Sequence, residues 1–394
     1  MLHQQEVVEL VNDINQRQDN KSFFYALAVG FIALLIVLFG GTMLYSTSSA
    51  TDGVKFFQAQ CQWTVIGLIA MSGVIFIGYR KLSTFSWWMM AGLAILLIWA
   101  AFFSPEIKGA NRWIVIPGVS TRFQPSELAK VVLSLFGAKV ASDHLRDISN
   151  IKLMFRRMWL PLGMIIVILG LVVCGKDLGT TLLLSAAMFA LFFAAGLRKI
   201  FLLLVPILIG LLVLYLAFLD AERLSRTVSF WNPGDQNLRA DDGYQLWNSW
   251  LALGSGGWTG IGFMESRMKQ SYLPEAHTDF ILAVVGEELG YIGLLCVIAA
   301  YLLFGYFGMK IAFNSRSRFG MLLAQTITLL IVLQAGINIG VISGGLPTKG
   351  ISAPMISYGG SNLLMNMIMV GLLVSVGLEN VPGLTANWPF RKSK

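Results

Sequence analysis

The chain has 394 residues, of which 56% are hydrophobic and only 13% are charged, against an apolar share of about half in soluble proteins. This composition excludes a soluble globular fold, and the formal net charge of +8 does not indicate nucleic-acid binding, because no soluble domain is long enough to carry a basic patch. Cys61, Cys174 and Cys296 lie in or at the ends of apolar runs, without the paired spacing of a disulfide framework or a zinc site.

Residues 1–22 are polar and are predicted to form a short cytoplasmic helix or a disordered tail. Apolar runs of the length that a hydrocarbon core of about 30 Å requires then recur along the chain. They predict an all-α polytopic membrane protein with about ten transmembrane helices, at 23–45, 62–79, 84–103, 126–142, 158–174, 179–196, 201–219, 279–305, 321–342 and 361–378. No repeat or linker divides them, so residues 23–378 are expected to form one membrane domain, followed by a cytoplasmic tail at 379–394.

Positively charged residues in short loops stay on the cytoplasmic side of a membrane. With the N-terminus inside, the inner connections contain Arg80, Lys81, Lys139, Arg146, Lys152, Arg156, Arg157, Arg198, Lys199, Lys310, Arg316, Arg318, Arg391, Lys392 and Lys394. The chain is therefore predicted to be a multi-pass protein of the inner (cytoplasmic) membrane, with both termini in the cytoplasm. Three segments rich in polar residues, glycine and proline are left outside, at 104–125, 220–278 and 343–360.

The first outer loop ends where a helix is expected to begin. Pro125 has the backbone angle that the first helical position requires, and Glu127 and Lys130 then share one face at i and i+3. One interpretation is a local ion pair that anchors the helix start. The other is a cationic pocket, because Arg112, Arg122 and Lys130 lie on the outer side, against the inward bias of positive charge.

The long loop at 220–278, between the seventh and eighth predicted helices, exceeds what a simple connection needs, and such loops are usually functional or disordered. Its four tryptophans argue against disorder. Within it, Leu246, Trp250 and Leu253 share one helical face, which predicts a helix along the membrane interface. The pattern fits a structural interface helix and a platform for a lipid substrate equally well.

Ionisable residues at membrane depth indicate function by default, because burying them there is costly. Asp279 stands at the outer mouth of the eighth helix, where the helix dipole favours a carboxylate. It is either a catalytic group or an N-cap, and Thr278 is a second capping candidate. His277 does not share a helical face with Asp279, so metal ligation by the two is not favoured. Glu287 and Glu288, about two turns deeper, predict a buried ion pair with a neighbouring helix.

The third outer loop adds Lys349 and a glycine-rich turn at 357–362. Backbone amides at such a turn can bind phosphate oxygens, although a glycine turn alone is weak evidence. Together the three loops place carboxylates and cations on the outer face of the membrane. That combination suits an anionic lipid-linked substrate.

These residues resemble those of the SEDS family (shape, elongation, division and sporulation). The resemblance covers the chain from about Phe24 to Pro382. It is carried by the motifs Arg112-Trp113, Gln124 to Lys130, Asp177 to Thr180, Leu251 to Gly257, Pro274 to Phe280 and Ile356 to Ser361. The motifs occur in the same order as in the family, and most of them fall on the predicted outer loops.

The resemblance implies a peptidoglycan glycosyltransferase that polymerises lipid II, an undecaprenyl-diphosphate-linked disaccharide-pentapeptide, on the outer face of the cytoplasmic membrane. It makes Asp279 the catalytic general base on the 4-hydroxyl of the acceptor sugar. The leaving lipid diphosphate needs nearby cations or a divalent metal ion such as Mg²⁺ or Mn²⁺. Glu127 is expected to orient Lys130. The candidate substrate-binding residues are Arg112, Glu127, Lys130, Lys349, His277 and Ser361.

Two positions depart from the family pattern. Gly175-Lys176 stands where the family has Gln-Pro before Asp177, which weakens the case for a role of that loop, and Asn362 replaces a usual serine. The segment 346–350 resembles the division branch of the family more than the elongation branch. A division role implies a septal location, a class B penicillin-binding protein as transpeptidase partner, and other divisome membrane proteins. The alternatives are an elongation polymerase, a lipid II flippase and a scaffold without catalysis.

Overall fold

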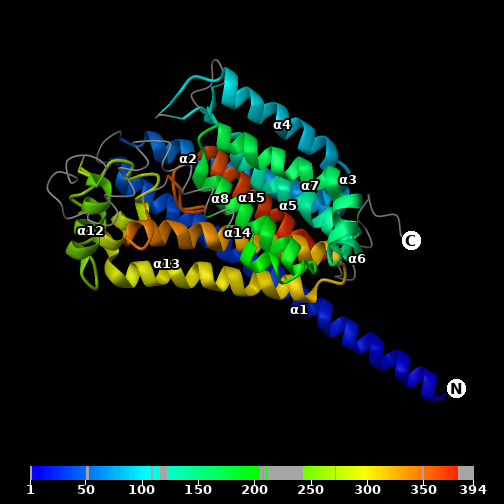
Figure 1. Ribbon diagram of the computed structural model, residues 1–394. Coiled ribbons are helices and arrows are strands. Elements are labelled where there is room, and N and C mark those ends of the chain that lie inside the picture. Colours follow the sequence, from blue (N-terminus) through cyan, green and yellow to red (C-terminus); the bar gives the residue numbers. More distant parts are fainter. Residues whose placement is uncertain are drawn as a thin grey trace.

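The computed structural model describes residues 2–49, 53–107, 110–115, 122–204, 207, 210, 243–270, 272–347 and 350–379. Figure 1 shows a bundle of helices that run side by side. The helices are α1 (Leu2–Ser49), α2 (Lys55–Ile77), α3 (Tyr79–Thr84), α4 (Ser86–Phe103), α5 (Pro125–Asp143), α6 (Leu145–Ile148), α7 (Ile151–Cys174), α8 (Leu178–Ala194), α12 (Tyr244–Gly256), α13 (Ile281–Asn314), α14 (Arg318–Ile342) and α15 (Gly360–Leu378). Two short strands, β1 (Ile114–Val115) and β2 (Arg122–Phe123), pair antiparallel.

Seven helices of the described chain are long and apolar enough to cross a membrane: α1 from Asn20 onward, α2, α4, α7, α13, α14 and α15. The predicted spans 126–142 and 179–196 correspond to α5 and to the 17-residue α8. The predicted span 201–219 lies almost entirely outside the described residues. The all-α polytopic membrane fold is therefore confirmed. Its boundaries differ in places, since α2 and α7 begin earlier than predicted and α13 ends later.

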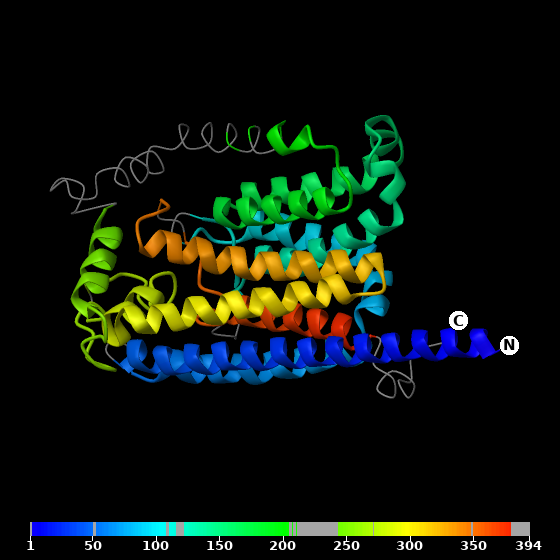
Figure 2. The same cartoon turned by 90° about the horizontal axis from the view of Figure 1, so that it is seen from below.

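The N-terminal segment is part of the first long helix. Helix α1 is continuous from Leu2, so the predicted short helix is not separate from the first span. Figure 2 shows this helix running along the bundle and extending beyond its end.

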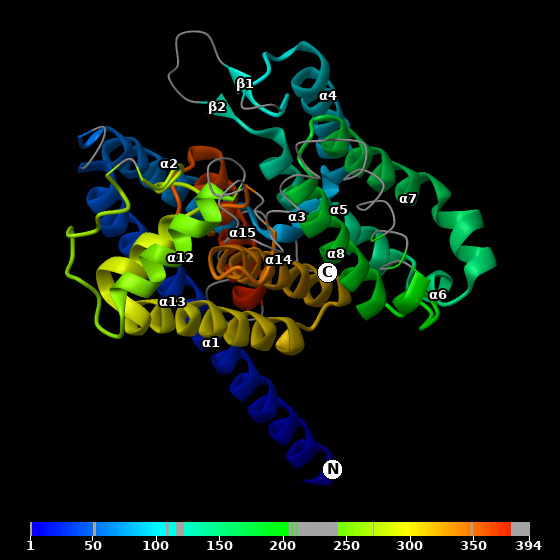
Figure 3. The ribbon, with the colours of Figure 1, turned by 60° about the vertical axis from the view of Figure 1, so that its left-hand side comes forward.

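Helices α5, α14 and α15 form the centre of the bundle (Figure 3). Helix α15 packs against α1, α2, α5 and α14, and α14 also contacts α8 and α13. In its most apolar stretch α15 is 83% buried, whereas α2 is 11% buried, so α2 presents its surface to the lipid.

Local sequence explains where several helices begin. Pro125 occupies the first turn of α5, as predicted, where its missing N–H costs no hydrogen bond. The side chains of Asn150, Asp177 and Ser317 accept backbone N–H groups at the starts of α7, α8 and α14, at 3.1, 3.2 and 3.0 Å. Each cap satisfies a donor that the helix itself leaves unpaired.

Helix α12 packs against α13 and α14. A Cβ added at Gly344 would lie 2.4 Å from Trp250 Cζ2, and one at Gly286 would lie 2.4 Å from Leu253 Cδ2. The face that the sequence singled out therefore contacts protein, with Leu246 fully buried beside it. The two glycines allow this close approach.

Candidate active site

Asp279 lies in the turns that precede α13. The helix begins at Ile281 with Phe280 as its N-cap residue, and no side-chain hydrogen bond caps it. The Thr278 hydroxyl donates to Glu275 Oε2 instead, at 2.8 Å. The capping interpretation of Asp279 and Thr278 is therefore wrong.

Asn338 on α14 holds the backbone around this carboxylate. Its Nδ2 donates to the carbonyl oxygen of Asp279 at 2.8 Å and to that of Ile351 at 2.7 Å. One buried amide thus joins the turn before α13 to the third outer loop. Because Asn338 is itself buried in the bundle, its hydrogen bond fixes the backbone position of Asp279.

Gly350 is the point where Asp279 and Arg112 meet. A Cβ added to this glycine would lie 3.0 Å from Asp279 Oδ2 and 3.8 Å from Arg112 Nη2. Both charged groups therefore border the same small volume, which a side chain at position 350 would fill. A carboxylate next to a guanidinium can accept a proton on one side and stabilise an anion on the other.

Arg112 is anchored by Asp177. Its Nη1 lies 3.7 Å from Asp177 Oδ1, an oxygen that also accepts the backbone N–H of Thr180 at 3.2 Å. The other oxygen of Asp177 accepts from Gln124 Nε2 at 2.9 Å and from Ser126 Oγ at 2.7 Å. Such charge-assisted hydrogen bonds fix a buried carboxylate firmly. Asp177 is therefore a rigid support for the arginine.

Asp177, Gln124 and Ser126 were not predicted as site residues. The available signals were the family motifs that contain them and an aspartate directly before an apolar run, which is typical of an N-cap. The unusual residue Lys176 has a φ of 60° and its Nζ lies 3.0 Å from Glu106 Oε1 in an exposed pair. Lys176, which departs from the family pattern, is thus placed at the surface. Asp177 next to it stays buried.

Lys130 lies behind the wall of the site. Its side chain is 1% exposed, and its Nζ donates to Glu127 Oε2 and Gln334 Oε1, both at 2.7 Å. Gln334 in turn donates to the carbonyl oxygen of Ser352 at 2.8 Å. The predicted pairing of Glu127 with Lys130 is present, but in this conformation the amine faces protein groups. It reaches the third outer loop through Gln334, a residue that the sequence did not single out.

Of the remaining predicted residues, His277 lies in the turns before α13 and Ser361 lies in the first turn of α15. His277 stacks on Phe56 with ring centroids 4.4 Å apart, and its carbonyl oxygen accepts from the backbone of Tyr358 at 2.9 Å. Burial raises the pKa of Tyr358, and the charge of Arg122 opposes that shift. Ser361 Oγ is buried and bonds the loop before α5, accepting from Gln124 N at 3.2 Å and donating to Arg122 O at 3.3 Å. The predicted site residue Lys349 lies outside the described residues.

A family model described as "Cell cycle protein", named for FtsW, RodA and SpoVE, matches residues 20–381. That span includes every site residue described above. The chain belongs to the SEDS family.

Named relatives agree with this assignment. The SEDS chain is 36% identical over 360 residues to a protein of Geobacter sp. (strain M18) named "Probable peptidoglycan glycosyltransferase FtsW", over 89% of this chain and 96% of that protein. A Nitrosomonas europaea protein of the same name is 35% identical over 366 residues, which cover 88% of this chain and 91% of that one.

Two solved structures share the fold. One, described as "Structural coordination of polymerization and crosslinking by a peptidoglycan synthase complex", superposes with a TM-score of 0.74 and 25% identity over 90% of this chain and 98% of that one. The rod shape determining protein RodA of Thermus thermophilus superposes with a TM-score of 0.67 and 24% identity, over 89% and 96% of the two chains.

Helix α13 of this SEDS protein is kinked at Gly290, whose φ is 68°. A Cβ there would lie 2.3 Å from Gly260 N, so the loop after α12 enters the kink. Four backbone hydrogen bonds replace those that the helix gives up, from Ile261 N to Glu287 O, from Gly262 N to Glu288 O, from Tyr291 N to Gly257 O and from Ile292 N to Trp258 O, at 3.0, 3.2, 2.9 and 3.2 Å. The long outer loop and α13 therefore form one unit.

The two glutamates before the kink bind the same loop. Glu288 accepts from Lys269 Nζ at 2.9 Å and from the hydroxyl of Ser46 on α1 at 2.6 Å. Glu287 accepts the Ser266 hydroxyl and the backbone N–H of Arg267, the latter at 3.1 Å. The predicted buried ion pair exists, but the prediction of its partner was wrong, because Lys269 comes from the loop and not from a helix. The segment that carries Asp279 is thus tied to α13 at both ends.

The described residues contain no group of three or more His, Cys, Asp or Glu side chains that could hold a metal ion. Magnesium is often bound by one or two carboxylates together with substrate phosphates. The divalent cation stays a prediction.

Proposed function

We propose that this protein is a peptidoglycan glycosyltransferase that polymerises lipid II at the outer face of the cytoplasmic membrane. The observation that carries the proposal is the meeting of Asp279 and Arg112 at Gly350, in a bundle built to cross a membrane. Relatives that match nearly the whole chain are named for this activity.

Asp279 acts as the general base. Its carboxylate takes the proton of the acceptor's 4-hydroxyl while that oxygen attacks the anomeric carbon of the donor sugar. A new carbon–oxygen bond forms, the bond from the anomeric carbon to the diphosphate breaks, and undecaprenyl diphosphate leaves with the electron pair. A positioned base contributes roughly 10² to 10⁴-fold to the rate.

Arg112 stabilises the leaving diphosphate. Asp177 positions the guanidinium of Arg112, and Nη2 of that guanidinium borders the volume at Gly350, where a phosphate oxygen can accept from it. A donor that is fixed before the reaction needs no reorganisation during it. Lys349 is proposed as a second cation, and a bound Mg²⁺ or Mn²⁺ would neutralise further charge on the diphosphate.

Lys130 and Glu127 act as positioning residues. The contact of Lys130 with Gln334, and of Gln334 with the carbonyl of Ser352, supports the loop next to Gly350. His277 and Ser361 are proposed to shape the substrate-binding surface through the neighbouring loops that they hold.

The positive-inside rule supports placing Asp279 outside. Arg80, Lys139, Arg157 and Arg198 lie near the end of the bundle where α3 and α6 are found, which we call the basic end (Figure 1). Helix α12 and the turns that carry Asp279 lie at the opposite end. With the basic end in the cytoplasm, both chain termini are proposed to be cytoplasmic.

A role in division follows from the named relatives and from the segment 346–350. The partner is then a class B penicillin-binding protein at the septum, alongside other divisome membrane proteins. A structural neighbour described as a peptidoglycan synthase complex supports such an assembly. Localisation of a tagged copy to the septum supports division, and localisation to the side wall supports a RodA-type role.

The test uses the protein purified with its penicillin-binding partner. Lipid II is added together with a transpeptidase inhibitor, and glycan strands are separated by length. Asp279→Asn should abolish strands while its melting temperature and partner binding stay unchanged, whereas Glu265→Gln, which removes an exposed carboxylate of the same outer loop, should keep them. Equal product from Asp279→Asn and wild type would remove Asp279 from its role. Transfer of lipid II across vesicles without strand formation would identify a flippase.

A further inference from the structure

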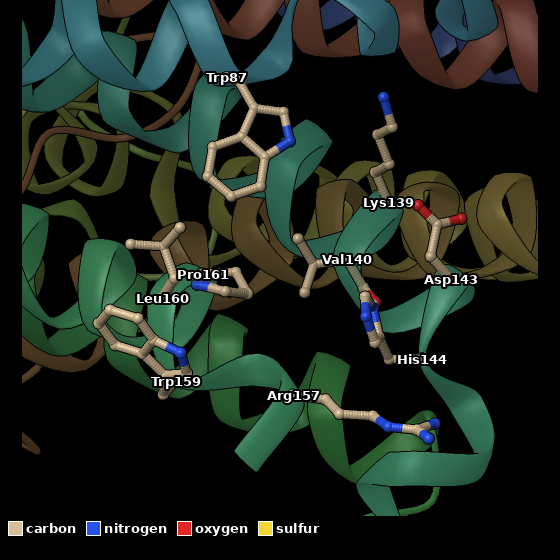
Figure 4. Close-up of a pocket in the computed structure, with 9 residues that line it drawn as sticks. All are labelled: Trp87, Lys139, Val140, Asp143, His144, Arg157, Trp159, Leu160 and Pro161. Atoms are coloured by element: carbon tan, nitrogen blue, oxygen red, sulfur yellow. The ribbon is translucent and has the colours of Figure 1, made fainter. Parts of the chain in front are cut away.

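A cavity of about 370 Å³ opens at the basic end, between the ends of α4, α5 and α7 (Figure 4). Its size lies within the range of small-molecule sites, about 300–1,000 Å³. It is lined by Trp87, Lys139, Val140, Asp143, His144, Arg157, Trp159, Leu160 and Pro161. None of these residues takes part in the proposed glycosyl transfer.

The cavity has two unlike walls. Figure 4 shows Trp159, Leu160 and Pro161 of α7 on one side, and Asp143, His144 and Arg157 on the other. Trp159 is 66% exposed, so its ring is presented to the surroundings of the bundle and not to its core. Trp87 is held in place by an edge-to-face contact with Phe136, with centroids 4.9 Å apart. An amphiphile fits such a cavity better than a wholly polar solute does.

The cavity lies at helix ends, which for membrane-spanning helices are expected at the level of the lipid headgroups. Trp87 is in the first turn of α4, His144 caps the end of α5, and Arg157 is in the second turn of α7. Tryptophan rings are enriched at this level of a membrane, where one side of the ring meets hydrocarbon and the other meets water.

Positive charge predominates around the cavity. The residues that line it include two cations, Lys139 and Arg157, and one anion, Asp143. Arg157 Nη1 lies 3.1 Å from Asp147 Oδ1, and Lys139 Nζ donates to the carbonyl oxygen of Ser83 at 3.0 Å. These contacts position the two cations while leaving them other N–H donors, since a guanidinium has five and an ammonium has three.

We propose that this cavity binds the headgroup of an anionic phospholipid, with the phosphodiester near Arg157 and Lys139 and the start of the acyl chains against Trp159 and Leu160. Basic pockets between transmembrane helices are known to bind lipid headgroups, at about 1 kcal/mol for each Lys or Arg near the surface. The excess of cations favours an anionic lipid over a zwitterionic one. Because α5 extends from this cavity to Glu127 and Lys130, a lipid bound here also stabilises the helix that supports the candidate active site.

Native mass spectrometry of the delipidated full chain tests the proposal. Phosphatidylglycerol and phosphatidylethanolamine with identical acyl chains are titrated in separate samples, and the retained lipids are counted. We expect wild type to retain phosphatidylglycerol preferentially. Arg157→Gln and Lys139→Gln should each weaken its retention about fivefold, as the loss of one cation predicts. Arg156→Gln, which removes the same charge from the adjacent position outside the cavity, should leave the retention unchanged.

One further variant and one competition experiment complete the test. Trp159→Ala keeps every charge and alters an exposed side chain that the fold does not need, so it should reduce lipid retention without lowering the melting temperature of the lipid-free protein. Soluble glycerophosphoglycerol should not compete with the lipid. Equal retention of both lipids by wild type, equal losses from Arg156→Gln and Arg157→Gln, or full competition by the soluble headgroup would overturn the proposal.

Discussion

Two lysines are buried in the described part of the chain, each paired with a glutamate, and they join different parts of the molecule. Lys130 pairs with Glu127 one turn away in the same helix, at 2.7 Å. Lys269 pairs with Glu288 at 2.9 Å and links the long outer loop to α13 and to Ser46 on α1. The helix alone would keep the first pair together, whereas the second pair holds segments that would otherwise separate. We therefore expect the Lys130 pair to matter most for the proposed active site and the Lys269 pair to matter most for the fold.

The largest expected effect comes from removing the charges of each pair together. Lys130→Met with Glu127→Gln should fold, because no unpaired charge is left in the interior, but should lose about 10²-fold in lipid II polymerisation, as misplacement of site residues by about 1 Å does. Lys269→Met with Glu288→Gln should stay within about tenfold of wild type. Initial rates of strand formation measure both effects. The reverse ranking would contradict the assignment of the two pairs.

The next effect concerns stability. Lys269→Met alone leaves Glu288 buried without its cation, and breaking a buried pair in this way costs about 3–5 kcal/mol. The double variant Lys269→Met with Glu288→Gln should recover most of that loss. Unfolding in detergent by increasing denaturant measures the difference. If the single and double variants unfold alike, the ion pair does not hold the loop.

Much of the fold could be predicted because the bilayer imposes a simple rule on sequence: a spanning helix needs about 20 apolar residues. The rule is weakest where polar groups lie within a helix. Helix α5 was nevertheless predicted, because Pro125 marks its start and apolar residues follow Lys130. The kink at Gly290 was not predicted, because it depends on the loop after α12, which is distant in the sequence and meets Gly290 only in the folded protein. Gly290 lies in an apolar run and has no distinguishing pattern.

The sequence predicted which charged residues belong to the site, but it did not predict the contacts between them. Asp279 and Arg112 were identified from their unusual place on the outer side, and the structure brings both to Gly350. Asp177 and Gln334 were missed, because their importance depends on which helix ends and loops meet. Spacing within one helix correctly paired Glu127 with Lys130, but it could not show that Lys269 would fold back onto Glu288.

The comparison can be sharpened at the kink, with a smaller effect on stability. Gly290→Ala introduces a side chain at a φ of 68° and 2.3 Å from Gly260 N. Backbone strain of this kind costs about 1–3 kcal/mol, and the loop must also shift. Gly170→Ala on α7 has nothing within 4 Å and should be neutral or slightly stabilising. Thermal unfolding of the two variants compares them, and equal melting temperatures would show that the loop does not depend on the kink.

The smallest effect is expected from a polar cluster at the basic end, which belongs to neither lysine pair. Tyr79 lies between the spans α2 and α4, donates its hydroxyl proton to Glu379 and contacts Ser317 Oγ at 2.9 Å. Tyr79→Phe should cost about 0.5–1.5 kcal/mol of stability, as the loss of one hydrogen bond does, because Glu379 keeps its ion pair with Arg80. It should leave polymerisation unchanged. A large loss of activity would show that this end of the bundle also supports the site.

The same cluster makes a signed prediction for pH. Burial raises the pKa of Tyr79 to about 12, from an ordinary value of 10, and the charge of Glu379 acts in the same direction. The folded protein therefore binds more protons than the unfolded chain between about pH 10 and 12, so the stabilisation is complete below pH 10 and is lost as pH rises toward 12. Melting curves from pH 9 to 11.5 should bring wild type and Tyr79→Phe progressively closer together. A constant difference across this range would mean that folding does not raise the pKa of the Tyr79 hydroxyl.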